Sequence, residues 1–215
     1  MMYNLESIVE RIHESFTSRT SAREEALAQA RSLIRHCANA IRAIHRDERE
    51  LAHNELQTAT SLASSLQKNQ QTFPDIYFEG YTQDALKEFA EASIVYSLTE
   101  NGTLPLPEEL GIEYAAYLKG MAEAIGELRR RCLDTLRVNH TQEAEQMLAY
   151  MDDIFAILIT MDYPDAITGG LRRLTDIARS IIERTRGDLT LSLRQENLEK
   201  SLHHLEQQLR SHPPQ

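Results

Sequence analysis

The segment "EYAAYLKGMAEAIGELRRRCLD", residues 113–134, is the clearest guide to the fold class. Its apolar side chains recur in alternating steps of four and three, at Tyr114, Leu118, Met121, Ile125, Leu128 and Cys132. This spacing is typical of one face of an α-helix that is buried against a core. We therefore expect a helix over residues 113–137 whose apolar stripe packs inside the protein.

The rest of the chain has the same helical period and no long alternation of the kind that predicts strands. We expect the first helix over residues 5–16, with Leu5, Ile8 and Ile12 on its apolar face. The capping-box pattern Ser21 to Glu24 predicts that a second helix begins there. Further helices are expected over residues 51–66, 82–99, 141–160, 165–186 and 189–209, with loops at 72–81 and 101–111 and a turn at Gly187. The prediction is one all-α domain over residues 1–210, a single-domain bundle of about seven helices, followed by a frayed tail at 211–215.

Composition narrows the class of protein. The 215 residues include no apolar run long enough to span a membrane, and the charged N-terminus does not resemble a secretory signal. Cys37 and Cys132 lie in apolar helical patterns, so we expect both thiols to be buried and reduced, as in a cytoplasmic protein. The formal net charge of −10 argues against an ordinary nucleic-acid binder but leaves room for a local basic patch.

Two pairs of glutamates are spaced one helical turn apart. Glu123 and Glu127 lie opposite the apolar stripe of the 113–137 helix, and Glu88 and Glu91 share a face in "DALKEFAEA", residues 84–92. Two antiparallel helices joined by the short 101–111 loop could bring these pairs together. Carboxylates so close need a compensating cation, and an all-oxygen ligand set suits Mg²⁺ or Mn²⁺. Spacing alone does not distinguish such a site from ordinary surface acids.

Four segments carry a resemblance to a known family. They are "IRAIHR" at 41–46, "DALKEFAEA" at 84–92, "EYAAYLKGMAEAIGELRRRCLD" at 113–134 and "DYPDAITGGLRRLTDIARSIIERTRGDLT" at 162–190. Together they resemble the translin / translin-associated factor X (TRAX) family, especially its prokaryotic TRAX-like members. The last two segments are long and specific, and the four follow the family's order over most of the chain.

The resemblance implies both a fold and an activity. Family members are all-α, seven-helix proteins that assemble into closed, hollow homo-oligomers, commonly octamers. TRAX-type members are metal-dependent endoribonucleases that cleave single-stranded RNA, whereas translin subunits mainly bind single-stranded nucleic acid, which extends the expected partners to single-stranded DNA. By this resemblance Glu88, Glu91, Glu123 and Glu127 correspond to the catalytic, metal-binding acids of TRAX, with Mg²⁺ or Mn²⁺ as cofactor. The family usually has aspartate where this chain has Glu123.

The cations that would bind RNA are less clear from the sequence. The family's basic run before the first acidic helix is replaced here by "FEGYTQD", residues 78–84, which has no basic residue. Candidates are Arg42, His45 and Arg46 in "IRAIHR", for which a solvated, ion-paired helix face is an equal alternative, and Arg130 beside the glutamates. For the run 129–131 as a whole and for the pair 172–173, salt bridges within or between subunits are favoured over RNA contact. An acidic exterior with a basic or metal-lined interior would reconcile the net charge with an RNA substrate.

Three alternatives to the nuclease stay open at this stage. The first is an all-α nucleotide pyrophosphohydrolase, which also holds Mg²⁺ on a Glu-x-x-Glu helix and a second acidic helix. The second acidic pair is usually three residues apart in that group, whereas Glu123 and Glu127 are four apart. The second is a non-catalytic, translin-like protein that binds single-stranded RNA or DNA. The third is a helical scaffold with no ligand.

Overall fold

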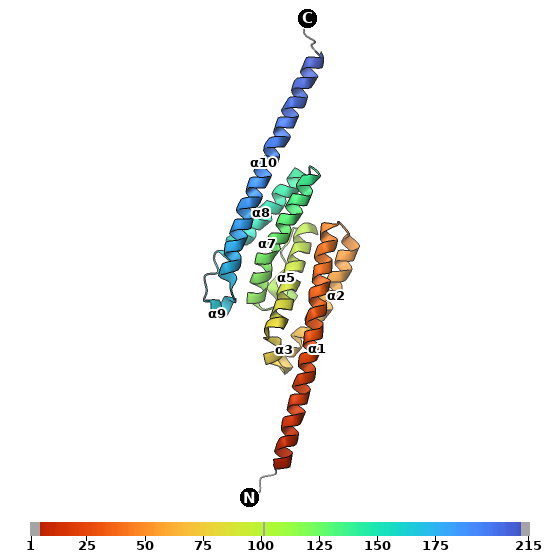
Figure 1. The fold of residues 1–215 in the computed structure, drawn as a ribbon, viewed down its shortest axis with the longest axis vertical. Helices are drawn as coiled ribbons and strands as arrows, with labels where there is room; N and C mark the ends of the chain where they lie inside the picture. The colour runs from red at the N-terminus through yellow and green to blue at the C-terminus, as the bar shows by residue number, and fades with distance from the viewer. Residues whose placement is uncertain (1–4, 101, 212–215) are drawn as a thin grey trace. The chain divides into compact units, whose positions relative to one another are not determined.

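The computed structural model describes residues 5–100 and 102–211, and every regular element in these ranges is an α-helix (Figure 1). The helices are α1 (Leu5–His45), α2 (Arg49–Gln67), α3 (Asn69–Thr72), α4 (Pro74–Tyr77), α5 (Gly80–Glu100), α6 (Pro107–Leu110), α7 (Tyr114–Arg137), α8 (Thr141–Leu158), α9 (Asp165–Thr168) and α10 (Leu171–Ser211). The predicted all-α class is confirmed. The predicted loops at 72–81 and 101–111 contain the four-residue helices α4 and α6.

The chain forms two compact units, Met1–Ala124 and Ile125–Gln215, and the boundary falls within α7. A single domain over residues 1–210 therefore stays a prediction. Of the predicted tail, Ser211 is the last residue of α10, and residues 212–215 lie outside the described ranges.

The first unit is built around α5. Helices α1, α2 and α5 contact one another, and Figure 1 shows them side by side. Buried residues occur all around α5, and many are small, including Ala85, Ala90, Ala92 and Ser93. Small side chains let neighbouring helices approach closely from several directions, so α5 is the central helix of this unit.

In the second unit, α8 packs on α10, and ion pairs join the second half of α7 to both helices. Arg131 of α7 pairs with Glu143 of α8 at 2.8 Å, and Arg129 pairs with Asp188 of α10 at 2.9 Å. The predicted apolar stripe of α7 is buried at Met121, Ile125, Leu128 and Cys132. Tyr114 is an exception, because its side chain is exposed and its hydroxyl donates a hydrogen bond to Glu108.

Two predicted helix breaks are wrong. Helix α1 runs without interruption through Ser21 and Glu24, and α10 runs through Gly187. The segment between residues 16 and 21 contains no glycine or proline, so nothing there prevents the helix from continuing. A single helical glycine costs about 1 kcal/mol, which the buried neighbours Thr185 and Leu189 offset through packing.

The apolar face predicted for the start of α1 is not buried in the described part of the chain. Leu5, Ile8 and Ile12 are all exposed. The two cysteines, Cys37 and Cys132, are buried and free, as predicted. Across residues 5–100 and 102–211, no helix combines the length and apolarity that crossing a membrane would require.

Candidate metal centre

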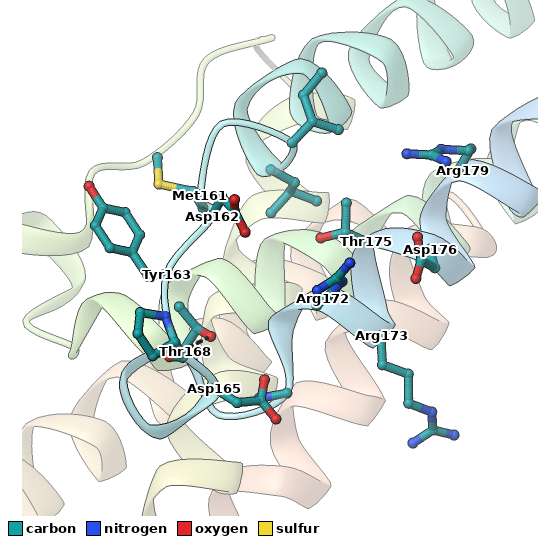
Figure 2. A pocket seen from close by; sticks show the side chains of 14 residues that line it. Met161, Asp162, Tyr163, Asp165, Thr168, Arg172, Arg173, Thr175, Asp176 and Arg179 are labelled. Carbon is teal, nitrogen blue, oxygen red and sulfur yellow. Dashed lines mark hydrogen bonds between the residues drawn. The ribbon is translucent and has the colours of Figure 1, made fainter.

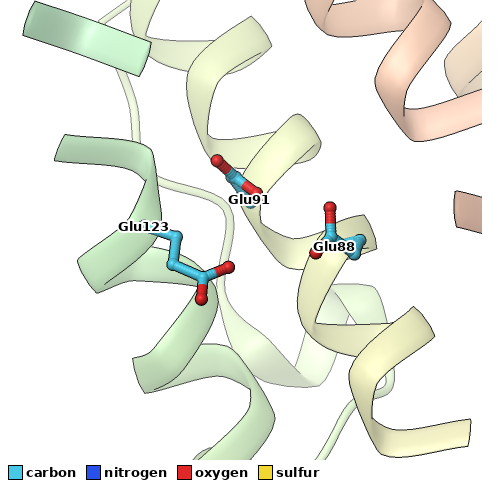
Figure 3. Close-up of side chains that lie close together, drawn as sticks. All are labelled: Glu88, Glu91 and Glu123. Carbon is cyan, nitrogen blue, oxygen red and sulfur yellow. The ribbon is translucent and has the colours of Figure 1, made fainter. Parts of the chain in front are cut away.

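Three of the four predicted acids lie close together in the first unit. Glu88 and Glu91 project from α5 and Glu123 projects from α7 (Figure 3). Each offers a carboxylate oxygen, and these three oxygens lie within 4.8 Å of one another. We call these three residues the acidic cluster.

The close approach of α5 and α7 at Gly120 accounts for this proximity. A Cβ atom placed on Gly120 would lie 2.6 Å from the carbonyl oxygen of Lys87 and 2.9 Å from the amide nitrogen of Glu91. Both contacts are with backbone, so no side chain can be accommodated without moving a helix. Because Gly120 lies almost one turn before Glu123, this contact holds the Glu123 side chain beside α5.

The remaining faces of α5 hold the acidic cluster in place. Leu86, Phe89, Ala90 and Ser93 are buried. Glu91 is only 8% exposed, whereas Asp84, one turn before Glu88, is exposed and outside the cluster. Packing on several sides of α5 thus fixes the direction of the two cluster glutamates that it carries.

Lys87 is a functional candidate that the sequence interpretation missed. Its Nζ atom lies 2.5 Å from Glu123 Oε2 and 3.0 Å from Glu88 Oε1. Burial by itself lowers the pKa of Lys87, but the hydrogen bonds and charges of Glu123 and Glu88 outweigh it and raise the pKa above its ordinary value. The contacts with Glu123 and Glu88 therefore favour the charged ammonium form of Lys87 at the edge of the acidic cluster. Lys87 is one of only four lysines in the chain and directly precedes Glu88. This position is the only hint in the sequence that Lys87 belongs to the site, and the hint is weak.

The donor atoms at this site are oxygens. Cys37 of α1 is the nearby sulfur, and burial, followed by the charges of Glu88 and Glu91, strongly raises the pKa of its thiol. A protonated thiol is a poor metal ligand. His36, the residue before Cys37, contacts Glu55, its Nδ1 atom lying 2.5 Å from a carboxylate oxygen. The residues present thus fit a hard cation such as Mg²⁺ or Mn²⁺ better than zinc.

Glu127, the fourth predicted acid, belongs to the second unit. It lies one turn after Glu123 on α7, and its carboxylate is 4.0 Å from the guanidinium of Arg130. Its participation in metal binding stays a prediction.

The predicted nucleic-acid contacts fall in two places. Arg42 and His45 are the basic residues in the last turn of α1, and Arg46 follows them. The negative end of the helix dipole favours positive charge at this position. Arg42 donates a hydrogen bond to Asn39, and both Arg42 and Arg46 are exposed. Arg130 is exposed in the second unit. The neighbouring arginines 129 and 131 form helix–helix salt bridges, as predicted for this run.

A cavity of about 1030 Å³ lies in the second unit, where the loop after α8 meets α9 and the start of α10 (Figure 2). Arg172 and Arg173 line it, together with Asp162, Asp165 and Asp176. Neither arginine forms an ion pair with another described residue of the chain, so the salt bridges expected for this pair are not found within the described residues. Salt bridges between subunits stay a prediction.

Comparison with known proteins gives consistent matches over most of the chain. The sequence is 34% identical over 190 residues to the uncharacterized protein MJ0175 of Methanocaldococcus jannaschii, covering 86% of this chain and 82% of the relative. No family model matches the sequence.

Solved structures also match over most of the chain. The crystal structure of AfC3PO superposes with a TM-score of 0.81 at 33% identity, covering 87% of this chain and 97% of that one. The structure of AfC3PO in complex with duplex RNA gives a TM-score of 0.80 at 32% identity over the same shares of the two chains. The crystal structure of apo-NeC3PO has a TM-score of 0.80 at 20% identity, covering 89% of this chain and 98% of that one, a likeness of fold alone.

Proposed function

The chain belongs to the translin/C3PO family, as a TRAX-like member of the prokaryotic type, and from this membership and the acidic cluster we propose that it is a divalent-metal-dependent endoribonuclease. Its substrate in this proposal is single-stranded RNA. The observation that carries the proposal is the convergence of Glu88, Glu91 and Glu123 from two helices on one small volume.

The residues of the acidic cluster share one part in this mechanism, which is to hold the metal ion. The carboxylates of Glu88, Glu91 and Glu123 would hold the metal ion, and Glu127 would add a fourth carboxylate. A bound Mg²⁺ or Mn²⁺ would supply Lewis acidity toward the phosphodiester and a more acidic water for attack on phosphorus. Because α5 is packed on several sides and α7 touches it at Gly120, the carboxylates are arranged before any ligand arrives. Such preorganisation lowers the cost of stabilising the charge that develops in the transition state.

RNA would be held by basic residues outside the acidic cluster. We assign this role to Arg42, His45, Arg46 and Arg130, because the arginines among them are exposed and could reach phosphate oxygens. AfC3PO has been solved with duplex RNA, which supports RNA as the class of ligand. Single-stranded DNA is the related ligand whose binding should be compared.

We further propose a cytoplasmic homo-oligomer, with an octamer as its expected size. The mass from light scattering tests this directly, and a monomer would contradict it.

A cleavage assay tests the enzyme. Purified protein is incubated with end-labelled single-stranded or duplex RNA in Mg²⁺, in Mn²⁺ or in EDTA, and the products are separated on a gel. We expect internal cuts in the single strand that require metal, and a loss of at least about a hundredfold in rate for Glu123→Gln, because a metal-holding carboxylate is removed. RNA affinity should stay within about threefold, since phosphate contacts supply most nucleic-acid affinity.

Asp84→Asn is the matched control. It removes one carboxylate from the same face of α5, one turn away from the cluster, and should leave cleavage unchanged. RNA binding without cleavage in any metal would indicate a non-catalytic binder. Hydrolysis of nucleoside triphosphates in place of RNA would indicate a pyrophosphohydrolase.

A further inference from the structure

Lys87 crosses from α5 to α7 and contacts two of the three cluster carboxylates. Its Nζ atom lies within 3.0 Å of oxygens on both Glu88 and Glu123, and its side chain is only 15% exposed. The carboxylates that it contacts are 28% and 30% exposed. These contacts are therefore partly shielded from water, which makes them stronger than surface ion pairs.

The contact of Lys87 with Glu88 and Glu123 changes the net charge of the acidic cluster. With each glutamate counted as −1, the acidic cluster carries a formal charge of −3, and the adjacent ammonium of Lys87 reduces it to −2. In the absence of metal, Lys87 offsets the repulsion between α5 and α7 that Glu88 and Glu123 would otherwise create. In the presence of a divalent ion, the same ammonium repels the ion and occupies carboxylate oxygens that the ion would use.

We infer that Lys87 is a built-in counter-ion of the acidic cluster, a positioning residue that holds the carboxylates together without metal and weakens their affinity for divalent cations. The inference rests on the proposed function, because it assumes that the cluster binds metal. It goes beyond that function because it makes Lys87, which is not itself a metal ligand, the residue that sets how tightly the carboxylates bind the ion. An affinity weakened in this way would make occupancy of the site follow the free Mg²⁺ concentration.

Direct Mn²⁺ binding to the full-length protein tests the inference without any activity measurement. Free Mn²⁺ is measured by electron paramagnetic resonance during a titration of wild type and of Lys87→Met. We expect Lys87→Met to bind Mn²⁺ roughly tenfold more tightly, the scale of one charged hydrogen-bonded contact. Its melting temperature without metal should fall, and saturating Mn²⁺ should restore it, since the ion then replaces the missing positive charge.

Three further variants complete the experiment. Lys87→Gln keeps a hydrogen-bond donor without the charge and should also bind more tightly, which covers the case in which Lys87→Met does not fold. Lys87→Arg keeps the charge and should stay within about twofold of wild type. Lys68→Met removes an exposed lysine of the first unit that forms no ion pair with another described residue, and it should change nothing.

The outcomes distinguish a failure of the role of Lys87 from a failure of the metal site. Unchanged or weaker Mn²⁺ binding in both neutral variants, with normal binding by wild type, would overturn the role of Lys87 and leave the metal site standing. Absence of Mn²⁺ binding in wild type and in every variant, or binding that survives Glu123→Gln unchanged, would overturn the metal site itself and the inference with it.

Discussion

At the scale of single residues, Gly120 is the position on which the candidate site depends most. The α5 backbone lies where its side chain would be, with the carbonyl of Lys87 at 2.6 Å from a Cβ atom. Gly126, less than two turns further along the same helix, would meet nothing within 4 Å. Two glycines in one helix thus have opposite roles, because one permits a close helix contact and the other only adds backbone freedom.

We expect Gly120→Ala to destabilise the protein by about 1–3 kcal/mol and to weaken Mn²⁺ binding, since α7 must move away from α5. Gly126→Ala should instead stabilise it by up to about 1 kcal/mol, by raising helix propensity. Urea unfolding measures the change in the free energy of unfolding, and the Mn²⁺ titration measures the change in Mn²⁺ affinity. Equal effects of the two substitutions would show that the close contact at Gly120 does not hold the site together.

At the scale of elements, the two 41-residue helices α1 and α10 show where local patterns mislead. A capping-box pattern at Ser21 and a glycine at residue 187 both predict helix ends, yet both helices continue. A cap stabilises an end only where the chain leaves the helix, and in α10 the packing of Thr185 and Leu189 on either side of the glycine keeps the chain helical.

Gly187→Ala tests the continuity of α10. We expect a gain of about 0.4–1 kcal/mol in the free energy of unfolding, because Gly187 is helical and a Cβ atom there would meet nothing within 4 Å. Gly170→Ala is the control in the same unit, since Gly170 has a φ of +88° and alanine there should be destabilising. If Gly187 were instead in a turn with positive φ, its substitution would also destabilise the protein.

At the scale of the whole molecule, charge is the property that most constrains RNA binding. The net charge is −10 with histidine counted as neutral, and only four residues are assigned to RNA, namely Arg42, His45, Arg46 and Arg130. Long-range repulsion should therefore slow association, and only local contacts would hold the phosphates.

The affinity for single-stranded RNA should depend only modestly on salt. With at most four phosphate contacts, the slope of log K against log salt concentration should be no steeper than about −3. Fluorescence anisotropy from about 50 to 200 mM salt, a range that separates weak from strong phosphate binding, measures this slope. A slope near −6 or steeper would mean that other cations, such as Arg172 and Arg173 of the second unit, contact the strand as well.

The sequence by itself determined the helical class and named the candidate acids. Apolar spacing predicts most of the buried stripe of α7, although the apolar face predicted for the start of α1 is exposed. The pairs Glu88–Glu91 and Glu123–Glu127 are placed on shared faces by the helical period alone. The bounds predicted for α5, 82–99 against Gly80–Glu100, are close because glycine and proline near both ends leave few alternatives.

Only the tertiary structure decided which groups meet. That Gly120 is in backbone contact with α5, that Lys87 reaches Glu123, and that α1 and α10 continue through their predicted breaks all depend on contacts between helices. Such contacts join residues distant in the sequence, and periodicity describes each helix separately. A local pattern therefore predicts which side of a helix faces a neighbour, while the packing of the neighbours sets the distances on which the chemistry depends.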